Sequence, residues 1–155
     1  RCGWVRRLHA VPRVDLRGMM PAEVLLESQA DFVMESPWTV GDLTVEGNQM
    51  AGSIDLWFEA DSLKVRLPNG IGHASAKGRA VRFSTFRSGY GDFDASGLDA
   101  ERVVAHQAGT GVMTLRPEGY LYLELSGAGT VQLLSEPQAQ DLNSWPDATG
   151  QIIGP

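Results

Sequence analysis

The feature that most constrains the fold is a pair of glycines separated by one residue, which recurs through the second half of the chain. The four pairs are Gly70 and Gly72, Gly89 and Gly91, Gly109 and Gly111, and Gly127 and Gly129. Their second glycines are 19, 20 and 18 residues apart, and the single glycines Gly52 and Gly150 extend the frame outward by 20 and 21 residues. A period of this length is typical of repeat proteins, in which each unit packs only against its neighbours.

Each second glycine is followed by alternating apolar and polar residues, the pattern of a short strand with one buried face. The position two residues on is apolar in every repeat and holds Ile54, Ala74, Phe93, Met113, Val131 and Ile152. A second alternating stretch follows in most repeats: Leu63–Leu67, Leu121–Leu125, Val81 with Phe83 expected to point inward, and a weaker one at 102–106. Two short strands in 18–21 residues predict one coil of a parallel β-solenoid, with equivalent side chains stacked in ladders.

The glycines are expected at the corners of the coils. There the chain turns sharply, a positive φ costs glycine little, and closely stacked backbones leave no room for a Cβ. The alternative fold is an antiparallel β-sandwich, which the strand spacing alone does not exclude. A constant glycine frame favours the solenoid, and the 155 residues then correspond to seven or eight coils of about 20 residues.

The sequence divides into a basic arm and one domain. Residues 1–17 carry five arginines and one acid, whereas the whole chain has a formal net charge of -6. Residues 18–155 are expected to form a single solenoid, with atypical capping coils at 18–50 and regular repeats at 51–155. The stretch 138–146 is expected to be a loop before a last coil. No convincing helix is present, since the only candidate, 21–27, is short.

Charge and composition narrow the classes of partner. An acidic body disfavours nucleic acid, whose phosphates need a basic surface. The arm, with Arg6 and Arg7, offers a contact for an anionic membrane surface or an acidic partner. No apolar run reaches the roughly 18 residues of a membrane-spanning helix. The single cysteine, Cys2, excludes an internal disulfide framework and is expected to be an ordinary thiol.

The segments Gly89–Ala100, Ala108–Leu115 and Leu125–Leu133 resemble the auto-transporter adhesin head GIN domain family (DUF2807). The resemblance covers about residues 40–154 and includes the strand that runs into Pro68. The chain departs from the family pattern where Ile71, Tyr90, Thr110 and Ala128 replace the common serine. The resemblance implies a right-handed β-solenoid exported to the bacterial envelope, periplasmic or extracellular with its leader removed, and without an established activity.

The residues that could support catalysis are few. The three histidines, His9, His73 and His106, have no metal-ligand spacing, so no metal is expected. The glycine pairs lack the third glycine and the following helix of a nucleotide-binding loop, so no cofactor is expected either. Asp92 and Asp94 remain the one alternative, as the acids of a β-helix-type carbohydrate-active enzyme. Their other interpretation is a solvated face with hydrogen bonds at a corner.

Aromatic side chains suggest a binding function instead. Tyr120 and Tyr122 are expected on the outer face of one strand and Tyr90 at a corner, where they could stack on sugars or contact a protein. Together with Arg6 and Arg7 they are the candidate binding residues. The sequence thus predicts a non-enzymatic envelope module for adhesion or scaffolding, with a protein or an envelope polysaccharide as partner. A further possibility is an extrinsic subunit of a membrane complex, attached through residues 1–17.

Overall fold

The computed structural model describes residues 23–26, 31–48, 51–70 and 72–155, and in these residues it is all-β. The strands are β1 (Glu23–Leu26), β2 (Phe32–Val33), β3 (Trp38–Gly47), β4 (Ile54–Gly70), β5 (Ala74–Gly89), β6 (Phe93–Gln107), β7 (Val112–Leu125), β8 (Thr130–Leu133), β9 (Ala139–Ser144) and β10 (Gln151–Ile153). In the coils of β4 to β7, the expected second strand is therefore continuous with the first. Strands β4 to β7, at 17, 16, 15 and 14 residues, each bend once and follow a whole coil.

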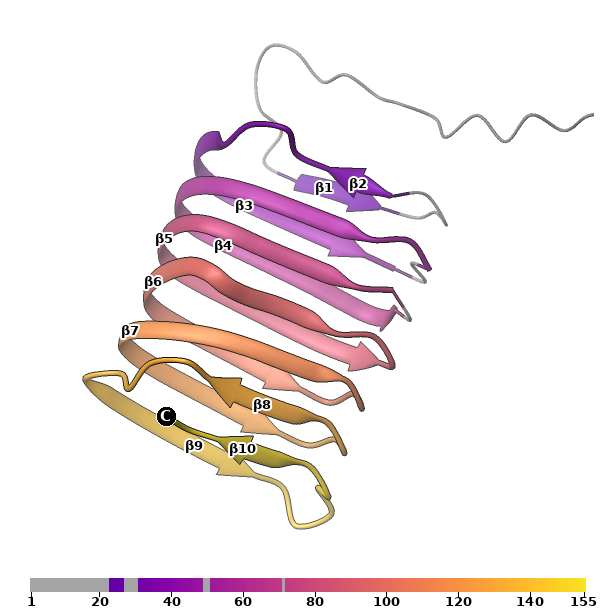
Figure 1. Ribbon diagram of the computed structural model, residues 1–155, viewed down its shortest axis with the longest axis vertical. Coiled ribbons are helices and arrows are strands. Elements are labelled where there is room, and N and C mark those ends of the chain that lie inside the picture. The colour runs from indigo at the N-terminus through magenta and orange to yellow at the C-terminus, as the bar shows by residue number, and fades with distance from the viewer. Residues whose placement is uncertain (1–22, 27–30, 49–50, 71) are drawn as a thin grey trace, which may run out of the picture.

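The coils stack into a β-solenoid of about six turns, and every strand pairing is parallel. Parallel pairing excludes the antiparallel sandwich. The chain winds in the right-handed sense as it descends from the indigo to the yellow end (Figure 1). The described turns number fewer than the seven or eight expected from the length, because they begin only at residue 23.

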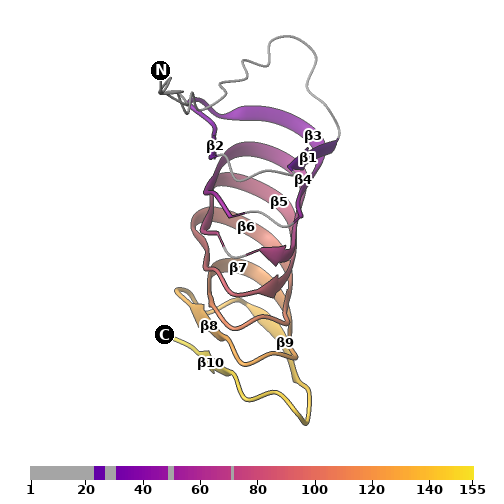
Figure 2. The same ribbon diagram turned by 90° about the vertical axis from the view of Figure 1, so that its right-hand side faces the viewer.

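Each coil has two flat sides, seen edge-on in Figure 2. The first layer contains β2, β8, β10 and the first halves of the long strands, and the second layer contains β1, β9 and the second halves. The two layers bury their inward residues against each other. Their outward residues form two broad, flat surfaces.

The predicted ladder of apolar residues is confirmed in the first layer. Successive register partners are Phe32, Ile54, Ala74, Phe93, Met113, Val131 and Ile152. From Ile54 to Val131 every member is at most 3% exposed. One coil cannot bury such residues alone, so the ladder ties the stability of each coil to its neighbours.

The prediction that Val81 points inward was wrong, whereas Phe83 is buried as predicted. Val81 is 41% exposed, and the inward residues in the second half of β5 are Phe83, Thr85 and Arg87. The bend of β5 includes Gly78, whose φ of 112° lies in the region that favours glycine. This bend changes which residues face inward, so the alternation on one side cannot be extrapolated to the other.

Close stacking is the main reason for glycine at the corners. A Cβ added to Gly72 would overlap the carbonyl oxygen of Gly52, and one added to Gly111 would overlap that of Gly91. A positive φ is found at Gly89, with 123°. The backbones therefore approach one another across successive coils too closely for a side chain.

The expected loop at 138–146 contains a strand. Residues Ala139–Ser144 form β9, which pairs in parallel with β7 although all six residues are exposed. The sequence of β9 lacks alternation, so its strand conformation depends on the neighbouring backbone of β7. Trp145 follows, and its indole Nε1 donates a hydrogen bond of 2.5 Å to Glu124 Oε1.

Candidate functional site

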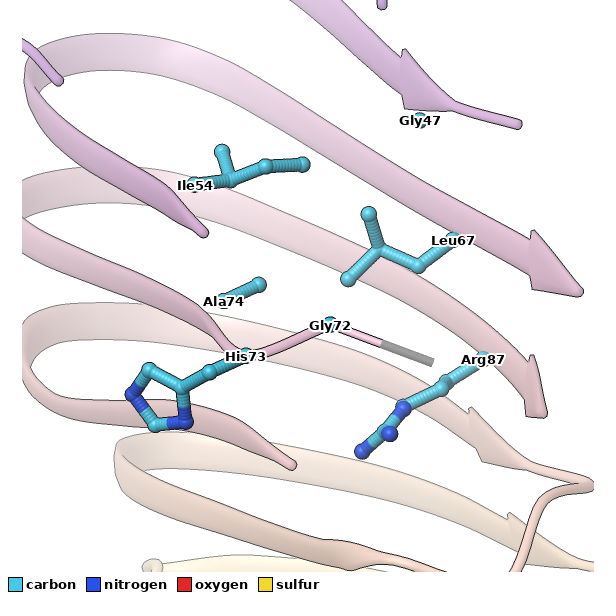
Figure 3. Close-up of a pocket in the computed structure, with 7 residues that line it drawn as sticks. All are labelled: Gly47, Ile54, Leu67, Gly72, His73, Ala74 and Arg87. Atoms are coloured by element: carbon cyan, nitrogen blue, oxygen red, sulfur yellow. The ribbon is translucent and has the colours of Figure 1, made fainter. Parts of the chain in front are cut away.

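The cavity found between the layers of the described coils is small. The cavity in Figure 3 has a volume of about 10 Å³, room for about one water molecule. It is lined by Gly47, Ile54, Leu67, Gly72, His73, Ala74 and Arg87. A larger hollow of about 620 Å³ lies open to solvent over the bend, lined by Thr39, Val40, Gly41, Glu59, Ala60, Asp61, Arg79 and Val81. The outer surfaces of the coils therefore offer the better candidate site.

A buried arginine borders the small cavity. Arg87 is 2% exposed and extends inward from β5 (Figure 3). Burial lowers the pKa of its guanidinium, and the negative charge of Asp92 opposes this shift. Its Nη1 donates to the carbonyl of Val112 at 3.4 Å. In the next coil Gln107 occupies the same column, and its Nε2 donates to the carbonyl of Gly111 at 2.9 Å. Both side chains thus reach from the second layer to the backbone at a corner.

The carboxylates of the enzyme alternative accept hydrogen bonds from backbone N–H groups. Asp92 Oδ1 accepts from Val112 N of the next coil at 2.8 Å, and Asp94 Oδ1 accepts from Ser96 N at 2.9 Å. These bonds hold a corner and a local turn in place. They also occupy one oxygen of each side chain that the catalytic interpretation would use.

The same kind of bond is found near the N-terminal end of the solenoid. Asp31 precedes Phe32 as Asp92 precedes Phe93, and its Oδ1 accepts from Ser53 N at 2.8 Å and from Ser53 Oγ at 2.7 Å. The backbone hydrogen bond, followed by the hydroxyl, lowers the pKa of Asp31. An aspartate just before the first-layer strand therefore connects one coil to the next.

The two described histidines, His73 and His106, have different surroundings. His106 Nε2 lies 2.9 Å from Ser126 Oγ, and its ring meets Phe86 edge-on at 5.1 Å between centroids. His73 is exposed beside the small cavity. His9 and Cys2 lie outside the described residues. Within the described ranges, no three His, Cys, Asp or Glu side chains gather as metal ligands would.

The outer surface of the second layer combines aromatic and cationic side chains in register. We call this the cationic face and define it by three outward columns. They are Arg82–Arg102–Tyr120, Lys64–Ser84–Val104–Tyr122 and Arg66–Phe86–His106–Glu124. Each column takes one residue from each successive coil, so strand spacing places its members about 4.8 Å apart along the stack.

Several of these side chains contact one another. The Arg102 guanidinium lies 4.8 Å from the ring centroid of Tyr120, and that of Arg66 lies 6.0 Å from Phe86. Arg66 also pairs with Glu46 at 3.5 Å. Among the described residues, no carboxylate forms an ion pair with Lys64 or Arg82. A chain of net charge -6 therefore presents a local excess of positive charge.

The structure brings together some of the predicted binding residues and not others. Tyr120 and Tyr122 share the cationic face, and both are half-buried. Tyr90 is 76% exposed at the corner between β5 and β6, at the other edge of the coil. Arg6 and Arg7 lie outside the described residues.

A family profile described as "Putative auto-transporter adhesin, head GIN domain" (DUF2807) matches residues 8–137. The chain belongs to this family. No curated protein and no solved structure matches this chain significantly. Membership of an adhesin-head family indicates an adhesion-like module with a cell-envelope or extracellular location. In the described part of this GIN-domain chain there is no helix of the length and apolarity needed to cross a membrane.

The arginine column of this GIN domain was not identified from the sequence. Arg82 and Arg102 are 20 residues apart, which is one period of the repeat. The signal that could have revealed them is the repeat frame, since positions one period apart become neighbours. Applied to outward residues, the frame makes Arg82 and Arg102 candidate neighbours, and the register between β5 and β6 decides that they pair.

Proposed function

We propose that this protein is a non-enzymatic binding module of the cell envelope, adhesion-like or scaffold-like, which binds its partner through the cationic face. The observation that carries the proposal is the register of this face, where Arg102 and Tyr120 stack and Tyr122 lies beside them. Aromatic rings on a flat β surface present an apolar face together with a polar tip, which suits recognition of sugars or of a protein. Membership of an adhesin-head family supports the same class of function.

The hydrogen bonds of the carboxylates favour this proposal over the carbohydrate-active alternative. Asp92 and Asp94 hold backbone N–H groups at a corner and in a turn, as the corner interpretation expects. Neither residue lines the cavity or the open hollow described above. We therefore propose that both acids stabilise the coil and that turnover does not depend on them.

Adsorption to isolated bacterial cell envelopes tests the binding face. The double variant Tyr120→Ala/Tyr122→Ala should lose most of its adsorption, because it removes both tyrosines of the face. Tyr90→Ala is the matched control, since it removes an exposed tyrosine at a corner. Full adsorption of the double variant, or a loss confined to Tyr90→Ala, would show that the face is not the binding site.

The enzyme alternative has its own test. The wild-type protein should release no reducing ends from a panel of polysaccharides. Asp92→Asn should lower the melting temperature, because a neutral amide accepts the bond from Val112 N less strongly than a carboxylate does. Measurable turnover that disappears in Asp92→Asn and Asp94→Asn would restore the enzyme interpretation.

The basic arm remains a separate proposal. We propose that residues 1–17 contact an anionic membrane surface or a membrane complex, on the basis of their five arginines. Deletion of residues 1–17 should reduce co-sedimentation with membranes and leave the melting temperature unchanged. Unchanged co-sedimentation would argue against this role of the arm.

A further inference from the structure

Two arginines lie side by side on the cationic face without an intervening acid. Arg82 and Arg102 are register partners in β5 and β6, and both are exposed. Neighbouring strands are about 4.8 Å apart, and like charges in directly opposed positions destabilise a sheet. Arg102 rests on the Tyr120 ring, and no carboxylate of the described chain pairs with Arg82. A bound anion would relieve the repulsion between them.

The positive charge extends over three consecutive coils. The outward rows read Ser62, Lys64, Arg66, then Arg82, Ser84, Phe86, then Arg102, Val104, His106. These rows contain four cations and no acid. Glu46 and Glu124 border the outer column and already have partners, since Glu46 pairs with Arg66 and Glu124 accepts from Trp145 Nε1. Asp42 and Asp141 continue the other two columns outside these three coils. The face is therefore complementary in charge to an extended polyanion.

The aromatic residues indicate which polyanion. Tyr120 continues the arginine column into the next coil, and Tyr122 lies beside it in the neighbouring column. A sugar ring stacks on such an aromatic face, while guanidinium groups bind carboxylate or sulfate in a forked geometry. We propose that the cationic face binds an anionic polysaccharide, with Arg82 and Arg102 on its acidic groups and Tyr120 and Tyr122 against its rings. This inference rests on the proposed binding function and names its ligand class.

Two other anionic partners fit the face less well. A peripheral membrane contact of this kind inserts large apolar residues, and among the outward residues of these rows Val104 is the one exposed large apolar residue. A stable protein interface needs an apolar centre, which three rows dominated by polar and charged residues do not provide. Both partners are included below as outcomes that would contradict the proposal.

The test compares polymers of different charge. Binding of the full chain to polygalacturonate, dextran sulfate and neutral dextran is measured by affinity electrophoresis at low salt and at about 0.15 M salt, where screening is strong. We expect binding to both acidic polymers that weakens with salt, and none to neutral dextran. Arg82→Gln/Arg102→Gln should weaken binding at least about tenfold, because each lost charged hydrogen bond is worth about a factor of ten or more.

A control variant has the same net charge as Arg82→Gln/Arg102→Gln. Arg79→Gln/Arg116→Gln also removes two cations, but these residues are outside the three columns of the cationic face and already pair with Glu101 and Asp99. Its affinity for the acidic polymers should change less than about threefold, as expected for exposed ion pairs. If both double variants lose affinity equally, net charge alone explains the binding and the proposed site is wrong.

Stability provides a second readout. Without polymer, Arg82→Gln should melt at the same temperature as the wild type or higher, because it removes a like-charge contact. Polygalacturonate should raise the melting temperature of the wild type, since a ligand that binds the folded state stabilises it. It should not do so for Arg82→Gln/Arg102→Gln. A clear drop in the melting temperature of Arg82→Gln alone would contradict the proposal, because it would give the arginine a structural role.

The remaining outcomes separate this inference from the proposed function. Equal binding of neutral dextran and dextran sulfate would show that the ligand need not be anionic, and the proposed binding face would still stand. Binding to phosphatidylglycerol vesicles with the same arginine dependence, but to no polymer, would replace the polysaccharide with a membrane. Binding to polyglutamate, but to none of the polysaccharides, would replace the polysaccharide with an acidic protein as the ligand. Failure of the Tyr120→Ala/Tyr122→Ala envelope test counts against the proposed function itself.

Discussion

At the scale of single residues, the backbone of the preceding coil leaves no room for a side chain at a corner glycine. A Cβ at Gly111 would overlap the Gly91 carbonyl, whereas one at Gly41 meets nothing within 4 Å. We expect Gly111→Ala to lower the free energy of unfolding by about 1–3 kcal/mol, the usual cost of overpacking. Gly41→Ala should be neutral or slightly stabilising. Urea titration of both variants measures the difference, and equal effects would mean that corner stacking is not what requires glycine.

The buried guanidinium of Arg87 is a second residue-scale feature. It is 2% exposed, and the hydrogen bond that its Nη1 donates to the Val112 carbonyl is long at 3.4 Å. Replacing a poorly paired buried charge with an apolar side chain of similar size is often neutral or stabilising by about 1–4 kcal/mol. Arg87→Met should therefore melt at the same temperature or higher, and Arg87→Ala lower, because alanine leaves a cavity. A large loss in Arg87→Met would show that the guanidinium holds the corner.

The bonds of Asp31 predict a pH dependence at the N-terminal coil. Hydrogen bonds from Ser53 lower the pKa of Asp31 below its ordinary value of 3.8. The folded state then binds fewer protons than the unfolded one, so this contribution is present above pH 3.8 and is lost as the pH falls through the lower folded pKa. The melting temperature of wild type should exceed that of Asp31→Asn at neutral pH, and the gap should close below pH 3.8. A gap independent of pH would exclude this titration.

At the scale of elements, opposite sides of one coil complement each other in volume. The first half of β5 and its bend place Ala74, Ala76 and Ala80 in the core, and the second half places Phe83 there. The Phe83 ring also stacks on Phe93 of β6 with 6.1 Å between centroids. Since both sides of the coil share one core, the large ring compensates for the small residues facing it.

This complementarity predicts that loss of the Phe83 ring lowers stability more than loss of the Phe86 ring. Phe83→Ala should lower the free energy of unfolding by about 3–5 kcal/mol, because nothing else fills the space. Phe86→Ala is the control on the same strand, since that side chain points outward and contacts His106 and Arg66. Chemical denaturation compares the two variants. Equal losses would mean that the core of β5 is not filled in this way.

At the scale of the whole molecule, stability should vary along the stack. Each coil is stabilised by its neighbours, so the inner coils of a solenoid open less often than the outer ones. Hydrogen exchange followed by mass spectrometry should find the slowest amides in β5 and β6. The fastest should be in β9, whose residues are all exposed. Uniform exchange along the chain would indicate a single cooperative unit instead.

Much of the architecture follows from local sequence. The glycine frame predicts parallel coils, and the residue two positions after each second glycine predicts the ladder from Ile54 to Ile152, because one period displaces the chain by one strand. The alternation within each strand also predicts that Tyr120 and Tyr122 face outward. These features need only the repeat and the pleat, and both can be read from residue order.

The remaining features depend on contacts between coils. The strand at 139–144 forms because β7 offers it backbone hydrogen bonds, and Val81 points outward because the bend of β5 shifts the alternation. The pairing of Arg82 with Arg102 likewise depends on the register between two coils. The solenoid and its ladder thus follow from residue order, because both repeat with the chain. Which charges share the cationic face depends on the folded coils, because the length of each bend sets which outward residues become neighbours.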